Sequence, residues 1–318
     1  MISIVTPVYN EEEILPEFHK RLTAVLNGAG EPYEIILVND GSRDDSLKLM
    51  KELNAGDPHV KVVGLSRNFG HQTAITAGLA YAAGDLIAIM DSDLQDPPEV
   101  LPAFFNKARE GFDVIYAIRK KRKEGVFKKA AYSIFYRLLK KMANIDIPLD
   151  SGDFCIMSRR ALDILNSMPE RNRFLRGLRG WIGLRQTGLE YDRDRRFAGE
   201  VKYTFSKLVK LAFDGFISFS YVPLRLASFF GLMISAMSFL GILIIFYLSF
   251  FTSTTTSVPG WASVLVTILF LGGVQLVSIG IIGEYIGRIY DEVKQRPLYV
   301  VQDALGFDAK NEGRAVSR

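Results

Sequence analysis

Two aspartates one residue apart, Asp91 and Asp93, directly follow the apolar run 86–89. The run predicts a buried strand, and ligands of open α/β sheets bind beyond the carboxyl ends of the strands. Carboxylate oxygens in that place suit a hard divalent cation such as Mg²⁺ or Mn²⁺. Because such a cation in turn suits a diphosphate, the pair indicates an enzyme that handles a nucleotide-activated substrate. The alternative is that both acids only cap a turn or a helix.

The elements that would position these acids alternate along the first 120 residues. Apolar runs predict strands at 2–8, 34–38, 60–65, 86–89 and 113–117, with helical segments between them. This alternation at short spacing predicts an α/β fold with a mostly parallel sheet, covered on both faces. The connections between parallel strands should be right-handed crossovers.

The second half of the chain contains a long stretch without charge. No Asp, Glu, Lys or Arg occurs in 226–283, although 23% of the whole chain is charged. The polar turn 252–260 divides this stretch into two apolar halves, each long enough to cross roughly 30 Å of hydrocarbon. We therefore expect two transmembrane helices within 226–286, joined by a short external loop at 252–260. A buried helical hairpin is the alternative, but little chain remains to build a core around it.

Basic residues flank the two predicted spans. Arg225 precedes the first, and Arg288, Lys294 and Arg296 follow the second. The positive-inside rule then places both termini in the cytoplasm. No basic segment followed by an apolar one occurs at the N-terminus, and Cys155 is the only cysteine, which fits a reducing compartment. We expect a multi-pass protein of the plasma (inner) membrane with a cytoplasmic catalytic domain.

Two further segments, 125–143 and 204–225, place apolar residues at helical spacing among lysines and arginines. This pattern predicts amphipathic helices at the membrane surface, although 125–143 could instead pack on the sheet with a solvated basic face. The segment 303–318 is polar and predicts an unstructured tail. The expected layout is a catalytic domain at 1–203, an interfacial helix at 204–225, membrane helices at 226–286 and a cytoplasmic tail at 287–318.

Several motifs together resemble those of family 2 glycosyltransferases of the GT-A fold (Rossmann-like, mostly parallel sheet). They are Thr6-Pro7-Val8-Tyr9-Asn10-Glu11, Val38-Asn39-Asp40-Gly41-Ser42, Asp91-Ser92-Asp93-Leu94-Gln95-Asp96-Pro97-Pro98-Glu99 and Ser151-Gly152-Asp153-Phe154. Within the family, the sequence is similar to polyprenyl-phosphate glycosyltransferases, which include dolichol-phosphate mannose synthases and bactoprenol glucosyltransferases of the GtrB type. The resemblance covers nearly the whole chain. A Gln-x-x-Arg-Trp motif, typical of processive synthases, is absent, which favours a single transfer.

The resemblance implies a nucleotide-sugar donor and a metal, Mg²⁺ or Mn²⁺, that neutralises the leaving diphosphate. Asp93 would be the main metal ligand, Asp91 would bind metal or ribose, and Gln95 would line the metal and sugar pocket. The nucleotide would contact Pro7, Tyr9, Glu11, Asp40, Asp91 and Ser92. For Tyr9 and Asp40 the alternatives are a strand-end aromatic and an Asx-turn.

The resemblance also implies a polyprenyl phosphate acceptor, whose phosphate attacks the anomeric carbon and inverts it. Asp153 would act as a general base or as a positioning residue, since a phosphate is already largely ionised at neutral pH. A helix-start acid is the alternative for Asp153. Eight arginines crowd 171–196, and one active site cannot use them all. The family pattern selects Arg119, Arg196 and Lys202 to bind the acceptor phosphate. The alternative is that these three residues only lie on the protein surface.

We therefore expect transfer of one hexose from UDP-glucose to undecaprenyl phosphate or a related lipid. The alternatives are mannosyl transfer from GDP-mannose and a membrane scaffold that only binds nucleotide. A net charge of +4 with plentiful acids does not indicate a nucleic acid partner. Glycines 272, 273, 280 and 283 in the second span would permit close helix contact. They predict a homo-oligomer, of which a tetramer would be one form.

Overall fold

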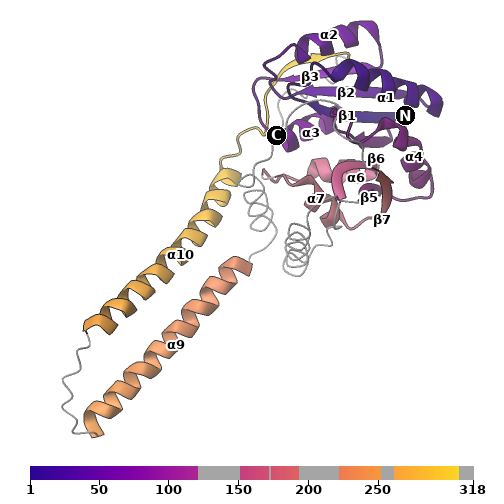
Figure 1. Ribbon diagram of the computed structural model, residues 1–318. Helices are drawn as coiled ribbons and strands as arrows, with labels where there is room; N and C mark the ends of the chain where they lie inside the picture. Colours follow the sequence, from indigo (N-terminus) through magenta and orange to yellow (C-terminus); the bar gives the residue numbers. More distant parts are fainter. Residues whose placement is uncertain (121–150, 172, 193–221, 252–260, 308–318) are drawn as a thin grey trace. The chain divides into compact units, whose positions relative to one another are not determined.

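The computed structural model describes residues 1–120, 151–171, 173–192, 222–251 and 261–307 (Figure 1). The chain divides into two units. The first consists of Met1–Leu208 with Gln295–Arg318, and the second is Val209–Lys294. The predicted helix at 125–143, most of the one at 204–225, the loop 252–260, Arg196 and Lys202 lie outside the described residues.

An eight-stranded sheet in the order β7-β5-β6-β4-β1-β2-β3-β8 forms the centre of the first unit. The strands are β1 (Ile2–Val8), β2 (Tyr33–Asn39), β3 (Val60–Leu65), β4 (Leu86–Ile89), β5 (Val114–Lys120), β6 (Ser151–Ser158), β7 (Gln186–Asp192) and β8 (Val301–Leu305). The strands β1 to β4 pair in parallel, as do β5 and β7, whereas β6 and β8 run antiparallel to their neighbours. The predicted α/β fold with a mostly parallel sheet is confirmed, with these two strands as the exceptions.

Helices cover both faces of the sheet (Figure 1). They are α1 (Leu15–Ala29), α2 (Ser46–Gly56), α3 (His71–Tyr81), the short 3₁₀ turn η1 (Pro98–Val100), α4 (Leu101–Arg109), α6 (Arg159–Ser167) and α7 (Leu175–Ile182). In α1, the residues Phe18, Leu22 and Leu26 recur every fourth position and are almost fully buried in the main core. This spacing places them on one helix face, which explains why the segment folds as an amphipathic helix on the sheet.

The helix α3 lies against β1 and β2 and is built from small residues. A Cβ atom added at Gly78 would lie 2.4 Å from a methyl carbon of Val5 and 2.7 Å from one of Val38. Only glycine allows this close approach between helix and sheet. The approach matters for function because the N-terminus of α3 carries His71 and Gln72.

The C-terminal segment returns to the first unit and completes the sheet. β8 pairs antiparallel with β3, with Val62 opposite Leu305, and the N–H of Ser66 donates to the carbonyl of Val300 at 3.0 Å. Tyr299 is 2% exposed, and the ring of Phe307 lies 4.8 Å from that of Tyr81. The prediction of an unstructured tail from residue 303 is therefore wrong for 303–305. Backbone pairing to an otherwise open sheet edge outweighs the polarity of this segment.

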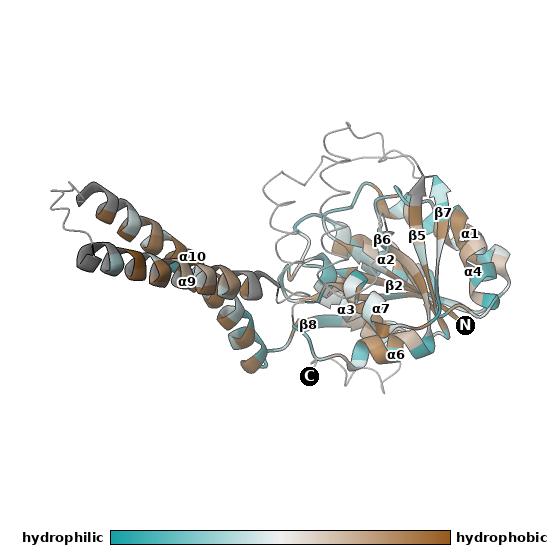
Figure 2. Ribbon diagram, turned by 90° about the horizontal axis from the view of Figure 1, so that it is seen from below, coloured by the Kyte–Doolittle hydropathy of each residue, from teal (hydrophilic) through white to brown (hydrophobic). Residues whose placement is uncertain are grey.

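The second unit contains the helices α9 (Val222–Phe251) and α10 (Trp261–Val293). Figure 2 shows apolar residues along both, and large apolar side chains such as Phe229, Leu232, Ile268 and Leu276 are exposed. Among the described residues, one stretch, Phe270–Val293, is long and apolar enough to cross a membrane; the apolar stretch Ala227–Gly241 in α9 is shorter. Of the two predicted spans, the structure thus supports one by length and composition. Self-association through the glycines of α10 stays a prediction.

Candidate active site

The carboxylates singled out in the sequence gather at one edge of the sheet. Asp91 and Asp93 follow β4 at its carboxyl end, and Asp153 lies near the start of β6. The two strands are antiparallel, with Ile89 opposite Cys155. Asp91 lies two residues beyond this pair on one strand, and Asp153 two residues before it on the other. The antiparallel direction of β6 therefore brings Asp153 to the same end as Asp91.

His71, the first residue of α3, lies between these two acids. Its Nε2 atom is 3.5 Å from Asp91 Oδ1 and 3.5 Å from Asp153 Oδ2. The parallel strand β3 leads into α3 at the carboxyl edge of the sheet, which explains the position of this histidine. One imidazole thus lies within ion-pair distance of both acids.

Asp153 is held by side chains from two helices. Arg176 of α7 donates from Nε to Oδ1 at 2.8 Å and from Nη2 to Oδ2 at 3.1 Å, a bidentate pair. Gln72 of α3 donates from Nε2 to Oδ2 at 3.1 Å and accepts the N–H of Leu175 at 3.2 Å. The single amide of Gln72 thereby joins Asp153 to the beginning of α7. The buried Arg179 donates to the backbone carbonyl of Gly152 at 3.0 Å and anchors α7 to β6.

The acids differ in their affinity for protons. Burial raises the pKa of Asp91 to about 6, partly opposed by the charge of His71 and reinforced by Asp153, Asp96 and Asp93. For Asp153, burial is outweighed by Arg176 and His71, which lower its pKa well below the usual value. Burial disfavours a charged His71, but Asp91 and Asp153 raise its pKa to about 9. At neutral pH the site therefore holds an ionised Asp153 and a protonated His71.

The donor set suits a divalent cation bound together with a diphosphate. Asp91 Oδ1 is buried and accepts no hydrogen bond; His71 pairs with it only at ion-pair distance, 3.5 Å, so the oxygen keeps lone pairs that a metal ion can take. Asp93 is 7% exposed, and its Oδ1 accepts the N–H of Gln95 at 3.1 Å. No three His, Cys, Asp or Glu side chains in the described ranges form a complete metal site. The residues present therefore fit a cation that takes its remaining ligands from a diphosphate and water.

The loops after β1 and β2 form the neighbouring part of the edge. Asn10 Oδ1 accepts the N–H of Arg43 at 2.8 Å, and Ser42 Oγ accepts the N–H of Asn10 at 3.1 Å. Ser46 Oγ accepts the N–H of Glu11 at 2.9 Å. These reciprocal bonds fix the two loops against each other. The predicted nucleotide residues Tyr9 and Glu11 thus sit on a braced surface.

Asp40 and Gly41 fix the turn that leads into α3. Asp40 is 3% exposed; its Oδ1 accepts the N–H of Phe69 at 2.7 Å, and its Oδ2 accepts that of Gly70 at 3.0 Å. Burial raises the pKa of Asp40, and these two bonds oppose the rise. Gly41 has a φ of 66°, and an added Cβ would lie 2.5 Å from the backbone of Arg67 and Asn68. This pair positions His71 and Gln72, whereas a contact of Asp40 with a base stays a prediction.

The remaining predicted residues have mixed positions. Pro7 lies inside β1, and its carbonyl accepts the hydroxyl of the buried Ser92 at 3.3 Å, which ties β4 to β1. Arg119 lies near the end of β5, in register with Tyr191 of β7. Contacts of Pro7, Ser92 and Arg119 with substrate stay predictions.

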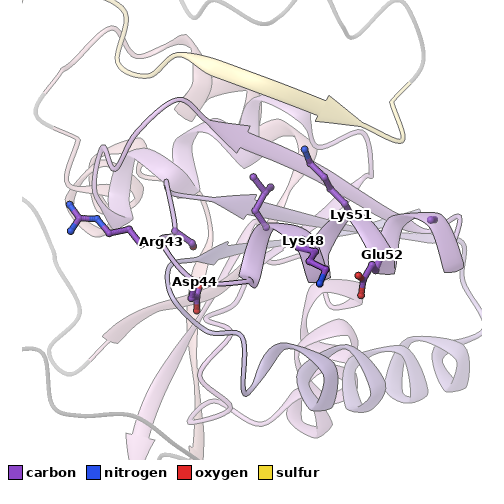
Figure 3. A pocket seen from close by; sticks show the side chains of 8 residues that line it. Arg43, Asp44, Lys48, Lys51 and Glu52 are labelled. Atoms are coloured by element: carbon purple, nitrogen blue, oxygen red, sulfur yellow. The ribbon is translucent and has the colours of Figure 1, made fainter.

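The hollow in Figure 3 lies along α2 rather than among the acids. It measures about 580 Å³ and is lined by Ser42, Arg43, Asp44, Leu47, Lys48, Lys51, Glu52 and Ala55. Only its Ser42–Asp44 end touches the loops described above. Because Asp91 and Asp153, whose pKa values are shifted, and His71 between them lie elsewhere, we place the candidate active site at their sheet edge, where Asp93 also lies.

Three residues of the site are missing from the predicted set: His71, Gln72 and Arg176. The first two could have been found, because the predicted order of strand 60–65, turn and helix puts the helix start at the carboxyl edge of a parallel sheet. Arg176 has no distinguishing signal, since it is one of eight arginines in a short stretch.

Sequence comparisons with known proteins identify glycosyltransferases over nearly the whole chain. The model of the family described as "Glycosyl transferase family 2" matches residues 3–165. "Uncharacterized glycosyltransferase YkcC" of Bacillus subtilis (strain 168) is 50% identical over 309 residues, covering 97% of this chain and 95% of that protein. "Bactoprenol glucosyl transferase" of Shigella phage SfII is 42% identical over 304 residues, covering 95% and 97%. "Prophage bactoprenol glucosyl transferase homolog" of Escherichia coli (strain K12) is 41% identical, covering 95% and 98%.

Solved structures resemble the chain more distantly. Mannosyl-3-phosphoglycerate synthase from Rubrobacter xylanophilus has a TM-score of 0.49 at 17% identity, covering 67% of this chain and 71% of that one. Glucosyl-3-phosphoglycerate synthase from Mycobacterium tuberculosis, in complex with Mn²⁺, UDP and glucosyl-3-phosphoglycerate, has a TM-score of 0.48 at 18% identity, covering 68% of this chain and 77% of that one. The family assignment rests on the sequence relatives.

Proposed function

The chain belongs to glycosyltransferase family 2, and we propose that it transfers one glucose from UDP-glucose to a polyprenyl phosphate, with inversion at the anomeric carbon. The observation that carries this proposal is the cluster of Asp91, Asp93 and Asp153 at one sheet edge, with a buried Asp91 oxygen that accepts no hydrogen bond. The choice of glucose and of a bactoprenol-type acceptor is supported by relatives of that name at 41–42% identity over nearly the whole chain.

A divalent ion, Mg²⁺ or Mn²⁺, would be held by Asp93 and Asp91, with Gln95 beside them. When bound, such an ion stabilises the negative charge that develops on the departing diphosphate. The protonated His71 adds a second positive charge, 3.5 Å from Asp91 Oδ1. The braced loops at Tyr9, Glu11 and Asp40 would hold the nucleoside.

Asp153 serves this reaction as a positioning residue rather than as a proton acceptor. Both of its oxygens accept bonds from Arg176, Oδ2 also accepts one from Gln72, and its pKa is low. A carboxylate that is stabilised in this way binds a proton poorly. The attacking phosphate oxygen is already ionised at neutral pH, so no base is required.

The helices α9 and α10 would form a two-span hairpin that anchors the enzyme to the cytoplasmic face of the plasma membrane. This interpretation is supported by the absence of charge in 226–283, by the 30-residue length of α9, and by exposed apolar side chains on both helices. The lipid tail of the acceptor would stay in the bilayer, and its phosphate would be available on the cytoplasmic side. Both termini would be cytoplasmic.

The test is a transfer assay with the purified full chain in detergent or bilayers. UDP-glucose, undecaprenyl phosphate and Mn²⁺ should yield a glucosyl lipid, and chelation of the metal or Asp93→Ala should abolish it. UDP-galactose and GDP-mannose serve as control donors that differ in the sugar alone or in both sugar and nucleotide. If only GDP-mannose yields a product, mannose replaces glucose as the transferred sugar. If no sugar nucleotide yields a product, the proposed transfer is refuted in favour of a nucleotide-binding scaffold.

A further inference from the structure

The arginines of 171–185 include one, Arg176, whose guanidinium reaches a carboxylate of the candidate active site. Arg171, Arg173 and Arg179 donate to backbone carbonyls of Arg296, Leu165 and Gly152 respectively. Arg185 lies over the ring of Phe112, 4.8 Å from its centroid. Arg176 instead binds the side-chain carboxylate of Asp153 through two nitrogens. It therefore brings a positive charge into the acid cluster itself.

The proposed reaction creates a need for a cation at this place. The attacking group is a phosphate monoester, and it must approach an edge that carries Asp91, Asp93, Asp96 and Asp153. A divalent ion at Asp91 and Asp93 would be engaged by the donor diphosphate. His71 lies 3.5 Å from both Asp91 and Asp153 and offsets part of this charge. Without a further cation beside Asp153, the acceptor phosphate would still meet like charges in a partly buried site, where such repulsion is strong.

Arg176 has the chemistry and the access to meet this need. Its side chain is 25% exposed, whereas Arg179 is 4% exposed. A guanidinium has five N–H donors in a fixed planar fork, so one edge can hold a carboxylate while another binds a phosphate oxygen. The bidentate bond to Asp153, together with the tie from Gln72 to Leu175, fixes the direction of the side chain before any substrate binds.

We propose that Arg176 binds the phosphate of the lipid acceptor and that Asp153 orients its guanidinium for this task. This inference rests on the proposed function. In the transfer step, an ionised phosphate oxygen forms the bond to the anomeric carbon. The bond from that carbon to the diphosphate breaks, and its electron pair leaves with the diphosphate. Arg176 keeps its proton throughout, because its role is to hold the attacking oxygen in line.

The test compares Arg176→Ala and Arg176→Lys with wild type and with Arg160→Ala, which removes an exposed arginine of α6. The KM for undecaprenyl phosphate should rise about 10- to 100-fold in Arg176→Ala, as expected for loss of a charge-assisted bond. Arg176→Lys keeps the charge without the fork and should show an intermediate rise. Affinity for UDP-glucose with Mn²⁺, measured by calorimetry, should stay within about twofold of wild type, because the proposal places Arg176 at the acceptor phosphate and not at the donor.

The outcomes separate this inference from the proposed function. If wild type transfers glucose to the lipid and both Arg176 variants keep its acceptor KM, the inference is wrong. An equal loss of donor and acceptor affinity would assign Arg176 a structural role and also overturn it. If Arg176→Ala does not fold, Arg176→Lys alone decides, through its acceptor KM. Failure of wild type to glycosylate any lipid phosphate would instead refute the proposed function.

Discussion

Asp91 makes metal binding depend on pH in a direction and amount that follow from its surroundings. A metal ligand must be ionised, and the pKa of Asp91 is raised to about 6. With that pKa, roughly 90% of Asp91 is ionised at pH 7 and roughly 10% at pH 5. The affinity for Mn²⁺ should therefore fall about tenfold between these values, or about 1.4 kcal/mol.

The neighbouring groups do not share this pH range. His71, with a pKa of about 9, stays protonated from pH 5 to pH 7, and Asp153 stays ionised because its pKa is well below the usual value. Their charges are therefore constant while Asp91 titrates. The sign of the effect is fixed: acidification protonates Asp91 and weakens metal binding.

The measurement is calorimetric titration of Mn²⁺ into protein saturated with UDP-glucose, at pH 5, 6 and 7 and constant ionic strength. UDP-glucose is the suitable nucleotide because its diphosphate, esterified at both ends, does not titrate in this range. Asp91→Asn should bind Mn²⁺ more weakly at pH 7 and show a flat pH profile. Equal affinity of wild type at pH 5 and pH 7, or an unchanged profile in Asp91→Asn, would refute the assignment of Asp91 as a ligand.

A second measurement on Asp91→Asn and three other changes have defined outcomes. Asp91→Asn should raise the metal-free free energy of unfolding at pH 7 by about 1–3 kcal/mol in urea titrations, because an acid with a raised pKa destabilises the fold once ionised; no gain would contradict this. Gln72→Glu removes the donor to Asp153 and adds a like charge, so kcat should fall at least about tenfold. A kcat equal to that of wild type would show that the bond from Gln72 to Asp153 is not needed for transfer. Gly41→Ala should weaken UDP-glucose binding in calorimetry, whereas Gly28→Ala, with nothing within 4 Å, should not. Tyr299→Ala should cost about 3 kcal/mol of stability by urea unfolding, and Tyr299→Phe much less.

Elements buried on both faces could be predicted from the sequence. The strands β1 and β3 begin and end where the apolar runs 2–8 and 60–65 do, because every residue of a doubly covered strand faces a helix layer. β6 and β8 escaped prediction for the opposite reason. β6 begins with Ser151, Gly152 and Asp153, and β8 includes Gln302 and Asp303, so neither shows a continuous apolar run.

The acids of the site could be predicted, but their partners could not. Asp91 and Asp93 follow from their position after the apolar run 86–89, whereas Asp153 follows only from the family motif because its strand is not predicted. The bonds from Arg176 and Gln72 to Asp153 depend on how α7 and α3 pack, and these contacts span 23 and 81 residues of sequence. Residue type alone does not select one arginine among eight.

The pairing of β8 with β3 also fixes an order of events during biosynthesis. Val62 and Leu305 are neighbours in the sheet, yet the ribosome must synthesise both long helices between making the first and making the second. The edge at β3 therefore remains open in the nascent chain until α9 and α10 have emerged. Since domains generally fold from the N-terminus during translation, completion of this sheet is the last step. A ribosome that stalls before residue 301 leaves a glycosyltransferase without its final strand, so completion of the catalytic unit follows synthesis of both helices.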